Sequence, residues 1–153
     1  MSREYPDRPI PGVAATIIHE NRILLVQRGK HPSKGMWGLP GGVVEVGETL
    51  KEAVVREVKE ETSVDVEPLE LITVFDTIRK DDEGKVRTHF ILFEYLCRYV
   101  GGNVNAATDA PDARWVSLDE LDSIDIMPTT KRFIEKTLVT HKNTLENYQM
   151  VKY

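Results

Sequence analysis

The stretch that decides the fold runs from residue 42 to residue 64 and reads GVVEVGETLKEAVVREVKEETSV. Its central part predicts a helix, because Thr49 is a good N-cap and Glu52, three residues later, completes a capping box. We expect this helix to end at about Thr62. On a helical wheel with about 100° per residue, its inner apolar stripe is formed by Leu50, Ala53 and Val54. One face of the helix is therefore expected to pack against the rest of the protein.

The second half of the helix places carboxylates where the first half places apolar side chains, and these carboxylates belong to Glu57, Glu60 and Glu61. Like charges three and four residues apart on a helix repel each other, and anions near its C-terminus oppose the helix dipole. A bound divalent cation would remove both costs. Oxygen ligands suit Mg²⁺ or Mn²⁺, and this stretch has no Cys or His that would indicate zinc. The alternative is a solvated acidic face on which Arg56 and Lys59 pair with the glutamates.

The same segment resembles the Nudix box. That pattern is a glycine, five residues, a glutamate, seven residues and then R-E-U-x-E-E-x-G-U, where U is aliphatic. The matching residues are Gly42, Glu48, Arg56, Glu57, Val58, Glu60, Glu61 and Val64. The family's last glycine is Ser63 here, at a position where a left-handed residue ends the helix. Residues 39–42 and 114–116 also look like the family, and the resemblance covers roughly residues 12–140.

The resemblance implies an α/β fold, a Nudix-type α/β/α sandwich with a mixed β-sheet, in which the box forms loop-helix-loop. We expect one domain over residues 1–153, with an extended lead-in at 1–11 and a C-terminal tail from about residue 142. Apolar and β-branched runs predict strands, with an interruption near Pro68 and a loop at 29–42. The expected strands are residues 13–19, 23–27, 43–46, 64–75, 87–100 and 114–116. A capping box at Ser117 and Glu120 predicts a short helix, and Thr129 or Thr130 is expected to cap a last helix that ends near His141.

The resemblance also assigns roles to residues of the box. It implies that the three helix glutamates bind divalent cations, with the carbonyl of Gly41 as a further ligand. It implies that Glu48 and Arg56 hold the loop and helix together and orient the metal ligands. The alternative for Arg56 is a surface pair with another helix glutamate, and the alternative for Gly41 is a plain turn.

For the reaction, we expect water to attack one phosphorus of a diphosphate while a carboxylate acts as base. Glu60 and Glu61 are candidates for that base as well as for metal binding. In several relatives a loop acid a few residues before the tryptophan acts as an extra metal ligand or as the base. We choose Asp109 over Asp112 for this role. An ordinary polar loop residue is the alternative at 109.

Three residues are candidates for substrate binding. Arg28 follows the second predicted strand and looks like the family's phosphate-contacting arginine, although a surface charge is the alternative. Trp37 and Phe75 are candidates for stacking on a base, and buried packing is the alternative for both.

The substrate follows from the resemblance alone. Nudix enzymes hydrolyse a nucleoside diphosphate linked to another moiety. Residues 30–42 resemble the small ADP-ribose pyrophosphatase branch, which predicts ADP-ribose as substrate and AMP and ribose 5-phosphate as products. Many ADP-ribose enzymes carry a proline where Lys80 stands. The alternatives are a (d)NTP pyrophosphohydrolase that clears oxidised or non-standard nucleotides, and a non-catalytic nucleotide-binding sensor. The complete set of box glutamates argues against the sensor.

Composition limits the classes of partner and compartment that remain open. The 153 residues correspond to about one domain, and the net charge of −5 argues against a nucleic-acid polymer as partner. The one cysteine, Cys97, lies in an apolar run and is expected to be a buried structural thiol. No stretch has the length of a membrane span or of a signal peptide's apolar core, so we expect a cytoplasmic protein without membrane contact. The family also suggests a homodimer, to which apolar residues near Tyr5 or Tyr148 would contribute.

Overall fold

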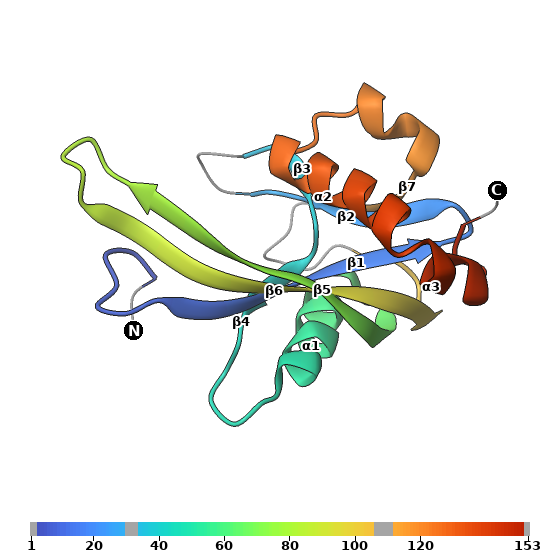
Figure 1. The fold of residues 1–153 in the computed structure, drawn as a ribbon, viewed down its shortest axis with the longest axis horizontal. Coiled ribbons are helices and arrows are strands. Elements are labelled where there is room, and N and C mark those ends of the chain that lie inside the picture. The colour runs from blue at the N-terminus through green and yellow to red at the C-terminus, as the bar shows by residue number, and fades with distance from the viewer. Residues whose placement is uncertain (1–2, 30–33, 106–111, 152–153) are drawn as a thin grey trace.

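The computed structural model describes residues 3–29, 34–105 and 112–151. Within them, seven strands form a mixed sheet in the order β3-β2-β1-β6-β5, with β4 paired to β1 and β7 paired to β2. Figure 1 shows this sheet between helix α1 on one side and helices α2 and α3 on the other. The strands are β1 (Ile10–His19), β2 (Arg22–Gln27), β3 (Trp37–Gly38), β4 (Gly41–Val43), β5 (Asp65–Lys80), β6 (Val86–Gly101) and β7 (Asp112–Ser117). The predicted α/β architecture with a mixed sheet is confirmed.

Strand β1 is the centre of the sheet and pairs with three neighbours. It forms an antiparallel hairpin with β2, and Glu20 and Asn21 form the tight turn with φ values of 50° and 63°. Both residues are therefore left-handed, as hairpin turns of two residues require. On its other edge β1 pairs in parallel with β6, and Ala14 lies opposite Glu94. The parallel pairing makes the sheet mixed and brings the middle of the chain beside its beginning.

Each face of the sheet carries its own hydrophobic core. The core under α1 joins that helix to β1, β5 and β6, and its buried residues include Val13, Ala15, Ile17, Val54, Val58, Tyr95 and Cys97. The opposite core lies under α2 and α3, and its buried residues include Ile18, Ile23, Leu25, Leu96, Ile134, Leu145 and Met150. Cys97 is buried, as predicted, and burial raises the pKa of its thiol well above the usual range. The two cores account for the sandwich of helix, sheet and helices.

Helix α1 (Leu50–Thr62) forms where the sequence predicts it. The Thr49 hydroxyl accepts a hydrogen bond from the backbone N–H of Glu52, and the Glu52 carboxylate accepts one from the N–H of Thr49. The helix ends at Ser63, which has a φ of 67° and donates its N–H to the carbonyl of Lys59. A serine thus adopts the left-handed conformation that usually favours glycine, at a cost of about 1 kcal/mol.

The β5–β6 hairpin is longer and more continuous than predicted. Strand β5 extends to Lys80, and the turn begins at Asp81, whose N–H donates to the carbonyl of Lys85. Pro68 does not interrupt the strand, because a shift in pairing register between Pro68 and Glu70 accommodates it as a bulge. In Figure 1 the hairpin extends beyond the helices at one side of the molecule.

Several other boundaries also differ from the predictions. The loop expected at 29–42 contains β3 and the start of β4, and the strand expected at 43–46 ends at Val43. Helix α2 (Pro128–Thr140) begins before Thr129 and Thr130, with Met127 as N-cap, because the fixed φ of proline suits the first helical position. Ser117 caps a 3-10 helix, η1 (Leu118–Ser123), through the N–H of Asp119.

The ends of the described chain are more ordered than a lead-in and a tail. Ile10 and Pro11 belong to β1, so the expected lead-in ends earlier. The segment expected as a tail contains α3 (Lys142–Asn147), because Leu145 and Met150 are buried against the second core. No helix in residues 3–29, 34–105 and 112–151 is long and apolar enough to cross a membrane.

Candidate active site

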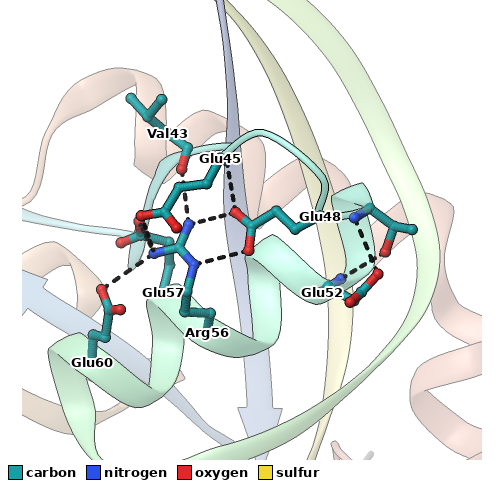
Figure 2. A network of polar contacts seen from close by, with 8 residues as sticks. Val43, Glu45, Glu48, Glu52, Arg56, Glu57 and Glu60 are labelled. Atoms are coloured by element: carbon teal, nitrogen blue, oxygen red, sulfur yellow. Dashed lines mark hydrogen bonds and ion pairs between the residues drawn. The ribbon is translucent and has the colours of Figure 1, made fainter.

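Arg56 joins the loop before α1 to the helix itself. Its Nε donates to Glu48 Oε2 at 2.9 Å and its Nη2 donates to Glu48 Oε1 at 2.6 Å. Nη2 also donates to the carbonyl of Val43 at 2.9 Å. Figure 2 shows Arg56 pointing from the helix into the loop, with these acceptors around its guanidinium. Two parallel bonds to one carboxylate fix both position and orientation, so the loop is held at one distance from the helix.

The charge of Glu48 follows from this geometry. Hydrogen bonds from Arg56 lower the pKa of the Glu48 carboxyl to about 2, and the backbone N–H of Glu45, 2.8 Å from Oε1, adds to the effect. The same carboxylate raises the pKa of the Arg56 guanidinium. The pair is therefore ionised at neutral pH, and the positive charge of Arg56 lies beside the box glutamates.

Glu57 lies against the glycine that opens the box. A Cβ at residue 42 would overlap the Glu57 carboxylate, so a side chain there would displace this carboxylate from its position. Glu57 Oε1 accepts a hydrogen bond of 2.8 Å from Arg56 Nη1, and its side chain is only 14% exposed. The carboxylate is thus held between the β4 backbone and the guanidinium.

Glu60 and Glu61 lie one turn further along α1 and take different directions. Glu61 Oε1 accepts a hydrogen bond of 3.2 Å from the N–H of Gly41, while Glu60 Oε2 lies 3.3 Å from Arg56 Nη1 and its side chain is 59% exposed. A Cβ at Gly41 would overlap the backbone carbonyl of Val13, so this turn too depends on glycine. The last two turns of α1 therefore place the carboxylates of Glu57 and Glu61 against Gly42 and Gly41, with Glu60 on the exposed side beside Arg56.

The donor chemistry of this cluster fits a hard divalent cation, because every ligand atom it offers is an oxygen. Among the described residues, the three carboxylates do not converge on one point in the way that a metal ion with three carboxylate ligands requires. Arg56 contacts both Glu57 and Glu60 and supplies the compensating positive charge (Figure 2). The carbonyl of Gly41 belongs to the glycine turn that Glu61 contacts. Glu45, in the loop before α1, has its Oε1 3.8 Å from Arg56 Nη1.

The three predicted substrate-binding residues are spread over the sheet. Arg28 is exposed just after β2. Its backbone N–H donates to the carbonyl of Met36, and its carbonyl accepts the N–H of Gly35. Trp37 is only 6% exposed and lies in the second core, with the Arg114 guanidinium 4.5 Å from its ring centre. This burial favours a packing role for Trp37 over stacking on a base. Phe75 is half-buried on β5 and contacts the Phe133 ring of α2, with centroids 4.6 Å apart.

The loop acids are only partly visible. Asp109 lies outside the described residues. Asp112 opens β7, and its carboxylate accepts the N–H of Ala113 at 2.9 Å.

The sequence reasoning missed a buried polar pair. Glu94 and Thr16 are both fully buried, and the Thr16 hydroxyl donates to Glu94 Oε1 at 2.8 Å. The signal was present, since Glu94 is the one charged residue in the apolar run 90–97, FILFEYLC. A charged residue inside a central strand is rare unless something bonds to it.

Comparison with known proteins places this geometry in a family. The model of the NUDIX domain matches residues 8–137. An ADP-ribose pyrophosphatase of Methanocaldococcus jannaschii is 38% identical over 116 residues, which are 76% of this chain and 66% of that protein. The NAD-capped RNA hydrolase NudC of Vibrio atlanticus is 31% identical over 136 residues, which are 88% of this chain and 47% of that protein. The chain thus spans about half to two thirds of the length of these relatives.

A solved structure supports the fold in the same way. The MutT NUDIX hydrolase from Burkholderia pseudomallei is 31% identical, with a TM-score of 0.72 over 84% of this chain and 98% of that chain. The predicted Nudix-type fold is therefore confirmed. Because the family model spans residues 8–137, including the whole box, the chain belongs to the Nudix hydrolase family.

Proposed function

We propose that the protein is a pyrophosphohydrolase that cuts the diphosphate of ADP-ribose to give AMP and ribose 5-phosphate. The observation that carries this proposal is the arrangement of Glu57 and Glu61 against Gly42 and Gly41, with Glu60 on the open side of the helix. Two carboxylates at the glycine turn and a third that shares the Arg56 guanidinium offer the oxygen donors that suit a metal-bound diphosphate. The likeness to the M. jannaschii ADP-ribose pyrophosphatase supports the choice of substrate.

Nudix hydrolases use divalent metal ions, and Mg²⁺ is the ion that we propose here, with Mn²⁺ as a substitute. Glu57, Glu60, Glu61 and the Gly41 carbonyl would hold it. When bound, such an ion neutralises the diphosphate and lowers the pKa of a bound water. Hard carboxylate and carbonyl oxygens favour these ions over softer metals.

The residues of the chain divide the remaining work. Glu48 and Arg56 are positioning residues, because their paired hydrogen bonds keep the loop and its glycines in register with the helix glutamates. A carboxylate takes the proton of the attacking water as the phosphorus–oxygen bond of the anhydride breaks. Glu60 and Glu61 are the candidates for this base on the helix, and Asp109 is the candidate on the loop.

Substrate contacts are proposed for residues on either side of the box. Arg28 is exposed and would contact a phosphate. Phe75 is half-buried and would stack on the base, whereas the burial of Trp37 favours a packing role. We also propose a cytoplasmic homodimer without membrane or nucleic-acid polymer as partner, and the exposed rings of Tyr5 and Tyr148 are candidates for the dimer contact.

A second candidate is a (d)NTP pyrophosphohydrolase that clears oxidised or non-standard nucleotides, which the likeness to the 8-oxo-dGDP phosphatase NUDT18 of Mus musculus, 35% identical over 98 residues, favours. It would use the same helix glutamates with a different base pocket. A sensor without turnover is disfavoured, because the complete set of box glutamates is retained.

The test is release of nucleoside monophosphate from ADP-ribose, nucleotide sugars, dinucleoside polyphosphates and (d)NTPs, with Mg²⁺, with Mn²⁺ and with EDTA. Metal-dependent hydrolysis of ADP-ribose at the highest kcat/KM supports the proposal. Faster hydrolysis of one (d)NTP selects the second candidate. Tight binding without turnover of any compound selects the sensor.

A further inference from the structure

The carboxyl of Glu94 is buried with half of its hydrogen-bonding capacity unused. Glu94 and Thr16 are both 0% exposed, and the Thr16 hydroxyl donates to Glu94 Oε1 at 2.8 Å. Glu94 Oε2 is buried without a hydrogen-bond partner in the part of the chain that the structure describes. An unsatisfied buried polar atom costs about 1–3 kcal/mol. Such a cost in the middle of a sheet calls for an explanation, and a bound ligand is one way to remove it.

Glu94 lies in the same cross-strand row as the active-site glycine. The row runs from Thr73 on β5 through Glu94 on β6 and Ala14 on β1 to Gly41 on β4. Because paired strands lie about 4.8 Å apart, the Cα atoms of Glu94 and Gly41 are separated by roughly 10 Å. The N–H of Gly41 bonds to Glu61. Glu94 thus lies two strands away from the site proposed for the diphosphate.

The strand between these two residues, β1, is partly exposed at Ala14. Ala14 is partly exposed, although it lies in the central strand and its neighbours from Gly12 to Ile18 are buried. Its backbone is paired on both sides, so solvent reaches it through the sheet face that its small side chain occupies. That face is shared with Thr16 and Glu94, since side chains two residues apart on a strand point the same way.

An aromatic ring lies on the same face of the sheet as Glu94. Phe75 on β5 lies opposite Leu92, which is two residues before Glu94 on β6, so all three side chains lie on one face. Phe75 and Leu92 are half-buried, whereas Glu94 is fully buried. The partly exposed Ala14 therefore lies between the box turn and a buried carboxyl group, with an aromatic side chain on the same face of the sheet.

We propose that Glu94, supported by Thr16, is a specificity-determining residue that binds the edge of an adenine base while the diphosphate lies at the box glutamates. This inference rests on the proposed function and names the base within it. The nucleoside would lie over Ala14, with Phe75 as an apolar neighbour of the base. The free oxygen of Glu94 would then gain the hydrogen bond that it lacks.

The pattern of donors and acceptors favours adenine over guanine. No ion pair involving Glu94 is found in the described residues, and a carboxyl buried without a cation is favoured in its neutral form. A neutral carboxyl offers one donor and one acceptor side by side. Adenine presents an amino donor next to a ring-nitrogen acceptor, whereas guanine presents the reverse order, an acceptor at O6 next to a donor at N1–H. Because the Thr16 hydroxyl donates to Oε1 and so fixes that oxygen as an acceptor, the two bases do not fit the carboxyl in the same orientation. Burial accordingly raises the pKa of the Glu94 carboxyl.

The test compares Glu94→Gln, Glu94→Leu and Thr16→Val with the wild type. Gln keeps a donor and an acceptor, Leu has neither, and Val removes the supporting hydroxyl. Binding of AMP and GMP is measured by calorimetry, which needs no turnover. In parallel, kcat and KM are measured for ADP-ribose, for GDP-mannose and for 5-phosphoribosyl 1-pyrophosphate, which has a diphosphate and no base.

The expected results separate base recognition from a structural role. The wild type binds AMP at least about tenfold more tightly than GMP. Glu94→Leu weakens AMP binding and raises KM for ADP-ribose by about tenfold or more, with kcat and the base-free substrate changed by less than about threefold. Glu94→Gln keeps the preference for AMP, and Thr16→Val weakens AMP binding less than the Leu variant does.

Four results would overturn the inference. They are equal affinity of the wild type for AMP and GMP, unchanged AMP binding by Glu94→Leu, an equal loss on the base-free substrate, and loss of AMP preference in Glu94→Gln. If the Leu variant does not fold, the Gln variant decides. If the wild type turns over none of the substrates, the proposed function fails, and the AMP and GMP affinities still decide the role of Glu94.

Discussion

The carboxylate of Glu57 occupies the space that a side chain at residue 42 would need, so Gly42 allows this carboxylate to lie directly against the loop of the box. The contact explains why the first residue of the box and the first glutamate of its REVKEE run belong to one structural unit. Arg56 completes this unit by bonding to Glu57 and to Glu48 at once. The box is thus a loop and a helix that position each other.

Substitution of Gly42 should lower the rate of the reaction more than it lowers the stability of the fold. We expect Gly42→Ala to displace the Glu57 carboxylate and to lower kcat/KM for ADP-ribose by about tenfold or more, because even a small misplacement of a metal ligand is costly in catalysis. Gly47→Ala is the matched control for a second glycine of the loop, where a Cβ would meet no neighbour but φ is positive. Steady-state kinetics with Mg²⁺ and thermal unfolding check both variants. Equal activity of Gly42→Ala and wild type would refute the role of this contact.

The paired hydrogen bonds of Arg56 should matter more than its charge. Arg56→Lys keeps the positive charge but cannot bond to both oxygens of Glu48 and to the Val43 carbonyl in the same planar geometry. We expect a drop in kcat of about tenfold to a hundredfold and a weaker response to Mg²⁺. Arg98→Lys, at an ion pair on the β5–β6 hairpin, is the charge-matched control. If Arg56→Lys behaves like this control, positioning by Arg56 is not needed.

Stability should depend on pH through Glu48. Its folded-state pKa lies at about 2, below the ordinary value of 4.5, so the folded state favours the ionised form. The stabilisation is therefore fully present above about pH 4.5 and is lost as pH falls toward 2. We expect Glu48→Gln to lower the melting temperature at pH 7, and this deficit to shrink below pH 4.5. Melting curves of both proteins between these pH values decide the question, and a deficit that stays constant or grows on acidification contradicts the assignment.

Replacement of Ser63 by the family's glycine should stabilise the protein. The φ of 67° at Ser63 costs a serine about 1 kcal/mol, and glycine adopts it without strain. We expect Ser63→Gly to raise the melting temperature by about 2–4 °C and to leave kcat unchanged. Ser63→Ala, which retains a Cβ, should not give this gain. Destabilisation by the glycine would mean that the serine side chain contributes more than its backbone strain costs.

How far the sequence predicts the molecule depends on the range of the interactions. Helix α1 was predictable because its start is fixed by a capping box of residues three apart, Thr49 and Glu52. Strand β3 was missed and the bounds of β4 were wrong, because two or three residues carry no periodicity and the pairing of these strands with β2 and β1 is tertiary. The end of the helix at Thr62 was also predictable from the residues, whereas the left-handed conformation of Ser63 was indicated only by the family pattern.

The site shows the same division. The box glutamates stood out because they break a helical apolar stripe, which is a local pattern. Glu94 and Thr16 are 78 residues apart, and only the parallel pairing of β1 with β6 brings them together. Trp37 illustrates the limit for aromatic residues, since stacking and packing look alike in sequence and its burial favours packing.

The central claim is that the carboxylates of α1 carry metal-dependent hydrolysis. The most direct test is the rate of AMP release from ADP-ribose at saturating Mg²⁺ by Glu60→Gln, beside wild type and Glu67→Gln. Glu60 is exposed at the end of the box helix, so its replacement should leave the melting temperature unchanged, as should that of Glu67 on β5. The account predicts a loss of about 10²–10⁴ in kcat for Glu60→Gln and none for Glu67→Gln. Retention of wild-type activity by Glu60→Gln would contradict it.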